Sequence, residues 1–134
     1  MTQARVLVAD DDLAVCKMVG RFLEQAGYEV ATANDGAQAL AEILQEKPDL
    51  LILDVAMPRM TGWEVLSQLR AREEYQTLPI LMLTALDTDA DVTRGWALGA
   101  DFYLPKPFRG QELVEVVKRL LQAGSAPPEE AQAE

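Results

Sequence analysis

The chain has 134 residues, of which 49% are hydrophobic and 25% charged, as expected for a single soluble globular domain. Its net charge of −10 argues against direct binding to nucleic acid or to an anionic membrane surface, and the lack of histidine excludes Ser-His-Asp and Cys-His catalysis. The single cysteine, Cys16, cannot form an internal disulfide, and no apolar run resembles a signal peptide or a membrane span, so we expect a cytoplasmic protein.

The first half of the chain alternates apolar runs with helical patterns. Residues 6–9 predict a buried strand, and Asp12 is placed to cap a helix that ends at Gly27. The apolar face of this helix is predicted to contain Val15, Val19, Phe22, Leu23 and Ala26. Residues 28–33 predict an edge strand, and the turn at residues 34–36 leads into a second helix that ends before Pro48. Its inward face is predicted to contain Ala37, Leu40, Ala41 and Leu44.

The second half repeats the alternation. Residues 50–53, 80–83 and 102–104 predict three further strands. A capping box at residues 61–64 predicts a third helix, and residues 88–98 predict a less regular fourth one. The last helix is the clearest, with one stripe formed by Leu113, Val116, Val117, Leu120 and Leu121. We expect one domain over residues 1–124 and a disordered, acidic, proline-containing tail over residues 125–134.

Continuous apolar strands that alternate with amphipathic helices indicate an α/β fold, a doubly wound parallel sheet of five strands with five helices. We expect the flavodoxin-like strand order 2-1-3-4-5. This order puts the second strand, which carries no candidate site residue, at an edge of the sheet. The point at which strand order reverses, where such sheets bind ligands, then lies between the first and third strands.

Polar residues follow four of the five predicted strands. Asp10 and Asp11 follow the first strand, Asp54 the third, Thr84 the fourth and Lys106 the fifth. Because the carboxyl ends of parallel strands share one edge, we expect these residues to converge. Acids, a hydroxyl and an ammonium together suit a site that holds a divalent cation and accepts a phosphoryl group.

The same segments resemble the receiver domain of two-component response regulators. The resemblance is carried by Val8-Ala9-Asp10-Asp11, by Leu53-Asp54-Val55-Ala56-Met57-Pro58 with Gly62, by Leu83-Thr84-Ala85 and by Leu104-Pro105-Lys106-Pro107-Phe108. It extends over roughly residues 5–121, with all motifs in order.

The resemblance implies a role for each site residue. Asp54 is the expected phosphoacceptor, and the expected ligands of Mg²⁺ (or Mn²⁺) are Asp11, Asp54, the backbone carbonyl of Ala56 and, through water, Asp10. Lys106 and Thr84 are expected to contact the phosphoryl oxygens, and the Lys106-Pro107 bond is a candidate cis peptide. Phosphorylation should draw Thr84 inward, and Tyr103 should turn into the vacated space, which would alter the surface formed by the fourth helix, fifth strand and fifth helix.

By the same resemblance, the chain is not a conventional enzyme and catalyses only its own phosphorylation and dephosphorylation. The donor is expected to be a histidine kinase or a histidine phosphotransfer protein. The output is expected to pass to a downstream protein partner, or to an effector domain if the chain is a piece of a longer regulator. Ala56 and Leu86 offer no group to orient an attacking water, which predicts slow hydrolysis of the acyl phosphate.

Three other readings of the pattern remain. The first is a Mg²⁺-dependent phosphatase or phosphotransferase with an aspartyl-phosphate intermediate, although Val55-Ala56 after Asp54 lacks the expected second aspartate. The second is a nucleotide- or flavin-binding module, although no glycine-rich loop follows the first strand. The third is a degenerate receiver used only for protein interaction, which the complete set of acids, hydroxyl and lysine argues against.

Overall fold

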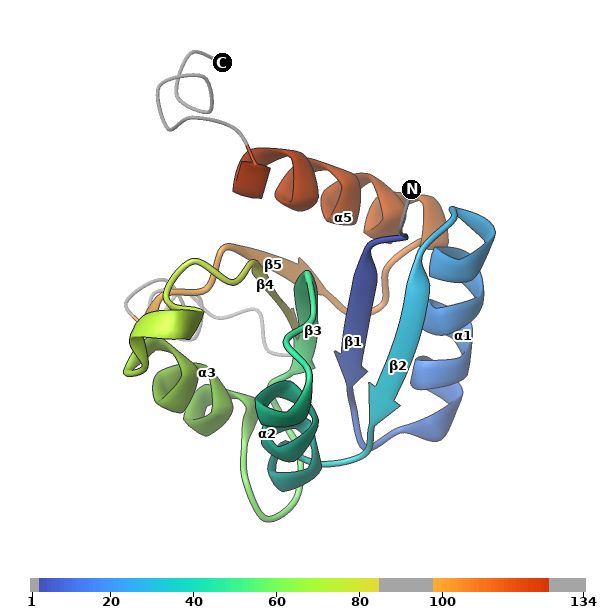
Figure 1. The fold of residues 1–134 in the computed structure, drawn as a ribbon. Helices are drawn as coiled ribbons and strands as arrows, with labels where there is room; N and C mark the ends of the chain where they lie inside the picture. The colour runs from blue at the N-terminus through green and yellow to red at the C-terminus, as the bar shows by residue number, and fades with distance from the viewer. Residues whose placement is uncertain (1–2, 85–97, 126–134) are drawn as a thin grey trace.

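The computed structural model describes residues 3–84 and 98–125, and it contains a five-stranded parallel sheet in the order β2-β1-β3-β4-β5 (Figure 1). The strands are β1 (Arg5–Ala9), β2 (Glu29–Ala33), β3 (Leu50–Asp54), β4 (Ile80–Thr84) and β5 (Phe102–Pro105). The predicted fold class and strand order are therefore confirmed, with β2 at an edge.

Helices cover both faces of the sheet: α1 and α5 lie on one face, and α2 and α3 on the other (Figure 1). The helices are α1 (Leu13–Gln25), α2 (Gly36–Gln45), α3 (Gly62–Arg70), the short 3₁₀ helix η1 (Glu73–Tyr75) and α5 (Gly110–Ser125). Most of the predicted helix over residues 88–98, together with Leu86 and nearly all of the predicted tail, lies outside the described residues. Within the described part of the chain, no helix is both long and apolar enough to cross a membrane.

The central strands are buried because both of their faces lie under helices. On β3, Leu51 and Leu53 belong to the core under α2 and α3, whereas Leu50 and Ile52 belong to the core under α1 and α5. All four side chains are fully buried. A strand that buries both faces needs a continuous apolar run, which explains why its sequence shows no polar alternation.

The helix ends follow the predicted capping chemistry. The Asp12 side chain accepts a hydrogen bond from the backbone N–H of Ala14 at 2.9 Å, so it caps α1. Thr61 and Glu64 form the reciprocal capping box that opens α3. Gly27 has a φ of +99°, the left-handed conformation expected just after a helix.

The predicted inward face of α2 is confirmed for Leu40, which is partly buried against the core, but it is wrong for the other three residues. Ala37 and Ala41 are exposed and Leu44 is 50% exposed, whereas Ala39 and Ile43 are fully buried. Apolar residues cover a wide side of α2, opposite a polar strip, so the sequence does not define which part of that side is buried. Packing against the sheet and α3 selects which side is buried. On α1, Phe22 is also 37% exposed, although Val19 and Leu23 are buried as predicted.

Arg70 joins α3 to the end of the sheet opposite the strands' carboxyl ends. Its guanidinium donates hydrogen bonds to the carbonyls of Gly99 at 2.9 Å and Tyr75 at 2.7 Å, and to the Asp101 carboxylate at 2.9 Å. Asp101 in turn accepts a hydrogen bond from the backbone N–H of Ile80 at 2.8 Å. One partly buried side chain therefore holds the starts of β4 and β5, the two strands that lead to Thr84 and Lys106.

We expect Arg70→Ala to lower the free energy of unfolding by about 2 kcal/mol, because it removes three hydrogen bonds from a charged, partly buried donor. Urea denaturation should measure the loss. Arg72→Ala, at an exposed neighbouring arginine, serves as the control and should change stability by less than about 0.5 kcal/mol. Equal effects of the two substitutions would contradict this role of Arg70.

Candidate functional site

The predicted site residues meet at the carboxyl edge of the sheet. Asp10 follows β1, Asp54 ends β3, Thr84 ends β4, and Lys106 follows β5. They border a single pocket of about 370 Å³, lined by Asp10, Asp11, Asp12, Asp54, Val55, Ala56, Thr84 and Lys106. The predicted convergence is therefore confirmed, and every candidate residue except Tyr103 lines this pocket.

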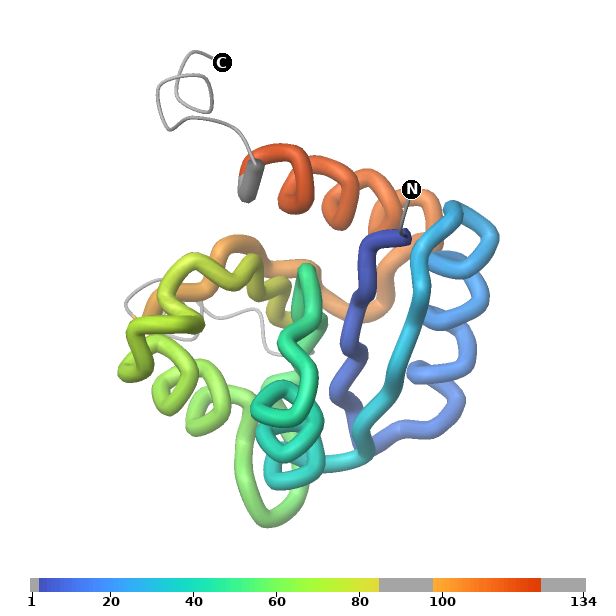
Figure 2. The backbone as a smooth tube through the Cα atoms, in the orientation of Figure 1, coloured from blue at the N-terminus to red at the C-terminus, as the bar shows by residue number. Residues whose placement is uncertain are grey.

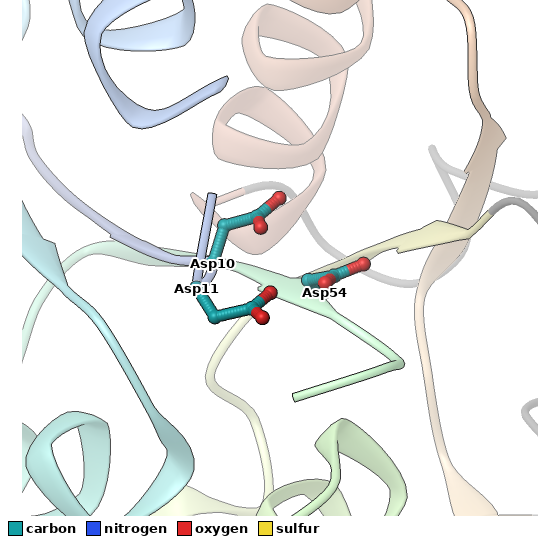
Figure 3. A group of neighbouring side chains, drawn as sticks. All are labelled: Asp10, Asp11 and Asp54. Carbon is teal, nitrogen blue, oxygen red and sulfur yellow. The ribbon is translucent and has the colours of Figure 1, made fainter. Parts of the chain in front are cut away.

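Three carboxylates crowd one side of the pocket. Figure 3 shows Asp10 and Asp11 in succession after β1 and Asp54 on the neighbouring strand, with the three carboxylate groups close to one another. Each offers a carboxylate oxygen that lies within 4.8 Å of the other two. Asp10 and Asp54 are buried, and Asp11 is exposed. This all-oxygen donor set, open to solvent on one side, fits a hard divalent cation such as Mg²⁺.

Lys106 lies against two of these carboxylates. Its Nζ is 3.0 Å from Oδ2 of Asp10 and 3.2 Å from Oδ1 of Asp54. The Lys106 backbone N–H donates to the carbonyl of Thr84 at 2.7 Å, and the Lys106-Pro107 bond is cis, as predicted. Burial by itself lowers the pKa of Lys106, but the hydrogen bond to Asp10 and the charges of Asp54 and Asp10 raise it overall. The ammonium therefore stays protonated.

The ionised form of Asp54 is disfavoured by its surroundings. Burial and, to a lesser degree, the negative charge of Asp10 raise the pKa of Asp54 to about 6, although Lys106 acts in the opposite direction. Only 5% of the residue is exposed. A cation placed among the carboxylates would relieve this penalty, so the electrostatics and the donor set point to the same ligand.

The contacts that orient Asp10 were not predicted. The backbone N–H of Asp12 donates to Oδ1 of Asp10 at 2.9 Å, and the thiol of Cys16 donates to the Asp10 carbonyl at 3.3 Å. Burial, followed by the charge of Asp10, raises the pKa of Cys16 to about 11, so this thiol stays protonated. One of these bonds uses a backbone N–H and the other a cysteine within an apolar helix face, and neither leaves a recognisable pattern in sequence.

The loop after Asp54 is held close to the end of β3. The Val55 N–H donates to the carbonyl of Leu83 at 3.0 Å, and the Gly62 N–H donates to the carbonyl of Val55 at 2.8 Å. A Cβ on Gly62 would lie 2.2 Å from the Asp54 carbonyl oxygen, so no other residue fits there without displacing backbone. Ala56, between these anchors, is exposed at the pocket.

The two predicted switch residues are both buried, with Thr84 3% and Tyr103 8% exposed. The Tyr103 ring contacts Trp63 of α3, with ring centroids 6.1 Å apart. Tyr103 on β5 is paired in register with Met82 on β4, two residues before Thr84. Thr84 and Tyr103 thus lie on adjacent, hydrogen-bonded strands, so a displacement of one strand end can affect the other residue.

Comparison with known proteins identifies relatives over most of the chain. The family model described as response regulator receiver domain matches residues 6–118. Response regulator MprA of Mycobacterium leprae is 47% identical over 118 residues, which are 88% of this chain and 51% of that protein. The alkaline phosphatase synthesis transcriptional regulatory protein PhoP of Bacillus subtilis is 44% identical, over 88% of this chain and 48% of PhoP. The chain thus spans about half the length of these curated relatives.

Solved structures agree with this result. The chemotaxis response regulator CheY4 of Vibrio cholerae superposes with a TM-score of 0.84 at 41% identity, over 89% of this chain and 99% of CheY4. A response regulator from Chloroflexus aurantiacus superposes with a TM-score of 0.86 at 41% identity, over 90% of this chain and 99% of that one.

The raised pKa of Asp54 predicts a pH-dependent gain in stability for Asp54→Asn. Because the folded-state pKa of about 6 exceeds the ordinary value of 3.8, ionisation of Asp54 opposes folding, and its cost appears as the pH rises from about 4 to above 6. Without metal, Asp54→Asn should therefore be about 2 kcal/mol more stable than the parent at about pH 8, with little gain at about pH 4.

Urea unfolding across this pH range measures the effect. Glu115→Gln, at an exposed position on α5, is the matched control and should show no such pH-dependent gain. A gain from Asp54→Asn that is the same at both ends of the range would contradict the electrostatic account.

Proposed function

The chain belongs to the response regulator receiver family, and we propose on this basis that it accepts a phosphoryl group from a phosphohistidine onto Asp54. The observation that most directly supports this is the place of the Asp54 carboxylate. It lies in a pocket that is also lined by the Lys106 ammonium and by three further aspartates, two of which, Asp10 and Asp11, have carboxylate oxygens close to that of Asp54. The proposal assigns the nucleophile to Asp54, charge stabilisation to Lys106, and metal binding to the carboxylates.

In the proposed reaction, a carboxylate oxygen of Asp54 attacks the phosphorus of the donor. The bond between phosphorus and the histidine nitrogen breaks, the nitrogen keeps the electron pair, and an acyl phosphate forms on Asp54. Dephosphorylation is attack of water on the same phosphorus, which releases inorganic phosphate and restores the carboxylate. The chain thus catalyses only its own phosphorylation and dephosphorylation.

The carboxylates are suited to hold Mg²⁺ or Mn²⁺. Asp11, Asp54 and the backbone carbonyl of Ala56 would be the ligands, with Asp10 acting through water. When bound, the ion supplies positive charge that offsets repulsion between the carboxylates and an incoming phosphoryl group. Asp10, which is fully buried and hydrogen-bonded to the Asp12 N–H, keeps its carboxylate in place for this role.

Lys106 and Thr84 are assigned to the phosphoryl oxygens. The Lys106 ammonium already lies 3.2 Å from Asp54, so a phosphoryl group on that carboxylate would come within its reach. Thr84 lines the same pocket, and its hydroxyl would donate to another phosphoryl oxygen. Phosphoryl transfer depends mainly on positioning and charge stabilisation, so this set of groups is sufficient.

The proposed output is a change at Thr84 and Tyr103. Movement of Thr84 toward the phosphoryl group would open space beside β4, and Tyr103 on the adjacent strand would shift with it. The affected surface would include β5 and α5, together with the predicted fourth helix. Tyr103 already packs against Trp63, so this contact would also change.

The proposed partners follow from the lack of a phosphohistidine in this chain. A histidine kinase or a histidine phosphotransfer protein would donate the phosphoryl group in the cytoplasm. The signal would pass to a protein partner or to an effector domain. A histidine-free chain cannot supply the donor itself.

We expect the protein to form a single phosphate adduct with acetyl phosphate and Mg²⁺, measured by intact mass. Asp54→Asn should form none, because the nucleophile is lost. Lys106→Ala should bind Mg²⁺ but react about a hundredfold more slowly, because charge stabilisation is lost. Asp12→Asn keeps a helix-capping acceptor next to the site and should still react. An adduct on Asp54→Asn that maps to another residue would move the acceptor elsewhere.

Ala56 should make the acyl phosphate slow to hydrolyse. It is exposed at the pocket and has no side-chain group to orient a water in line with the phosphorus. Ala56→Asn, which adds such a group, should speed phosphate release by about tenfold. Release is measured from purified phosphoprotein, with Ala56→Val as the control for side-chain size. If Ala56→Asn releases phosphate no faster than the parent, position 56 does not set the lifetime.

A further inference from the structure

The loop between β3 and α3, residues 55–61, carries the proposed metal-binding carbonyl of Ala56 and runs beside the first turn of α2 (Figure 2). Hydrogen bonds from Val55 to Leu83 and from Gly62 to Val55 hold the two ends of the loop. These two bonds do not restrain the residues between Val55 and Gly62, which are held by other contacts. The position of Ala56 therefore depends on what restrains the stretch between these anchors.

Arg59 lies in this middle stretch in an unusual backbone conformation. Its φ is +67°, and among the described residues it is the one residue other than glycine with a positive φ. This left-handed region is unfavourable for a residue with a Cβ, so it persists only where surrounding contacts impose it. Such conformations concentrate at functional sites.

The Arg59 side chain binds the start of α2. Its Nη2 lies 2.7 Å from Oδ2 of Asp35, the N-cap residue of α2. The other oxygen of Asp35 accepts a hydrogen bond from the Gln38 N–H at 2.8 Å. These contacts, the Gln38 bond first and Arg59 next, lower the pKa of Asp35 and keep it ionised. Asp35 therefore holds the helix start and the loop at the same time.

Backbone packing reinforces the ion pair. A Cβ on Gly36 would lie 2.6 Å from the Met60 carbonyl oxygen and 2.9 Å from Cγ2 of Val65. The first turn of α2 thus lies directly against the residue after Arg59, with no space for a side chain between them. The loop and the helix start form one packed unit.

We propose that Asp35 and Arg59 are positioning residues for the cation site. Their ion pair holds the β3–α3 loop in the conformation in which Ala56 borders the pocket. The inference rests on the proposed function, because it concerns the carbonyl assigned there to the metal. It adds two residues that do not line the pocket.

The charges of the two residues make the test decisive. If they act only through their charge, removing the positive Arg59 strengthens Mg²⁺ binding and removing the negative Asp35 weakens it, with additive effects. If they act as a positioning pair, Arg59→Gln and Asp35→Asn each weaken binding by about two- to fivefold, the range for an exposed ion pair such as this one, in which the Arg59 side chain is 70% exposed. The double variant is then no weaker than the weaker single variant.

The experiment is a titration of the full chain with Mg²⁺ alone, followed through backbone amide resonances. Asp35→Asn keeps a capping oxygen for α2, and Arg59→Lys, which keeps the charge, should retain most of the affinity. Arg119→Gln removes the same charge from an exposed position on α5 and should bind like the parent. Melting temperatures without metal establish that each variant is folded.

The outcomes separate this inference from the proposed function. An Arg59→Gln variant that binds Mg²⁺ as tightly as the parent, or more tightly, overturns the positioning role and leaves the metal site standing. A parent that binds no Mg²⁺ overturns both. Weaker binding by both single variants, without additivity in the double variant, supports the inference.

Discussion

Lys106 lies between Asp10 and Asp54, and this contact joins three strands at the edge where the site is built. Among the described residues that line the pocket, it is the one cation beside four aspartates. Its charge offsets only part of the cost of ionising Asp54, because burial and, to a lesser degree, the charge of Asp10 keep the pKa of Asp54 raised to about 6. Surplus negative charge in a buried site disfavours the folded state, and the same surplus favours a bound cation. The same negative charge therefore lowers the stability of the metal-free fold and raises the affinity of the site for a cation.

The unfavourable charge at the site must be offset by favourable packing elsewhere, and the core of the sheet supplies it. The residues of β1, β3 and β4 are almost all buried, and cores on both faces of the sheet hold them in place. The residues that line the pocket lie on loops and strand ends just beyond these strands, and the rigid strands position them. Gly62 adds a close contact behind Asp54, because the backbone of α3 touches the carbonyl of the proposed phosphoacceptor.

Sequence reasoning succeeded where the signal was local. The caps at Asp12 and Thr61 were predictable because a side-chain acceptor directly before an apolar helical pattern can bind the free backbone N–H groups of the first turn. Most of the inward face of α2 was not, because the apolar side of this helix is wider than the strip that is buried, and only its neighbours select that strip. The strand order rested on alternating elements and on the receiver resemblance, and the sheet confirms it.

The sequence by itself determined which chemical groups follow which strands, because strand patterns and turn residues are encoded over a few positions. The tertiary structure decided how those groups act on one another. Lys106 meets Asp54 across 52 residues and Asp10 across 96, Asp54 becomes buried, and Arg59 reaches Asp35 on another element. Such contacts depend on the strand order and on loop conformations that local patterns do not specify. The raised pKa of Asp54 and the support of its loop arise only once the sheet has assembled.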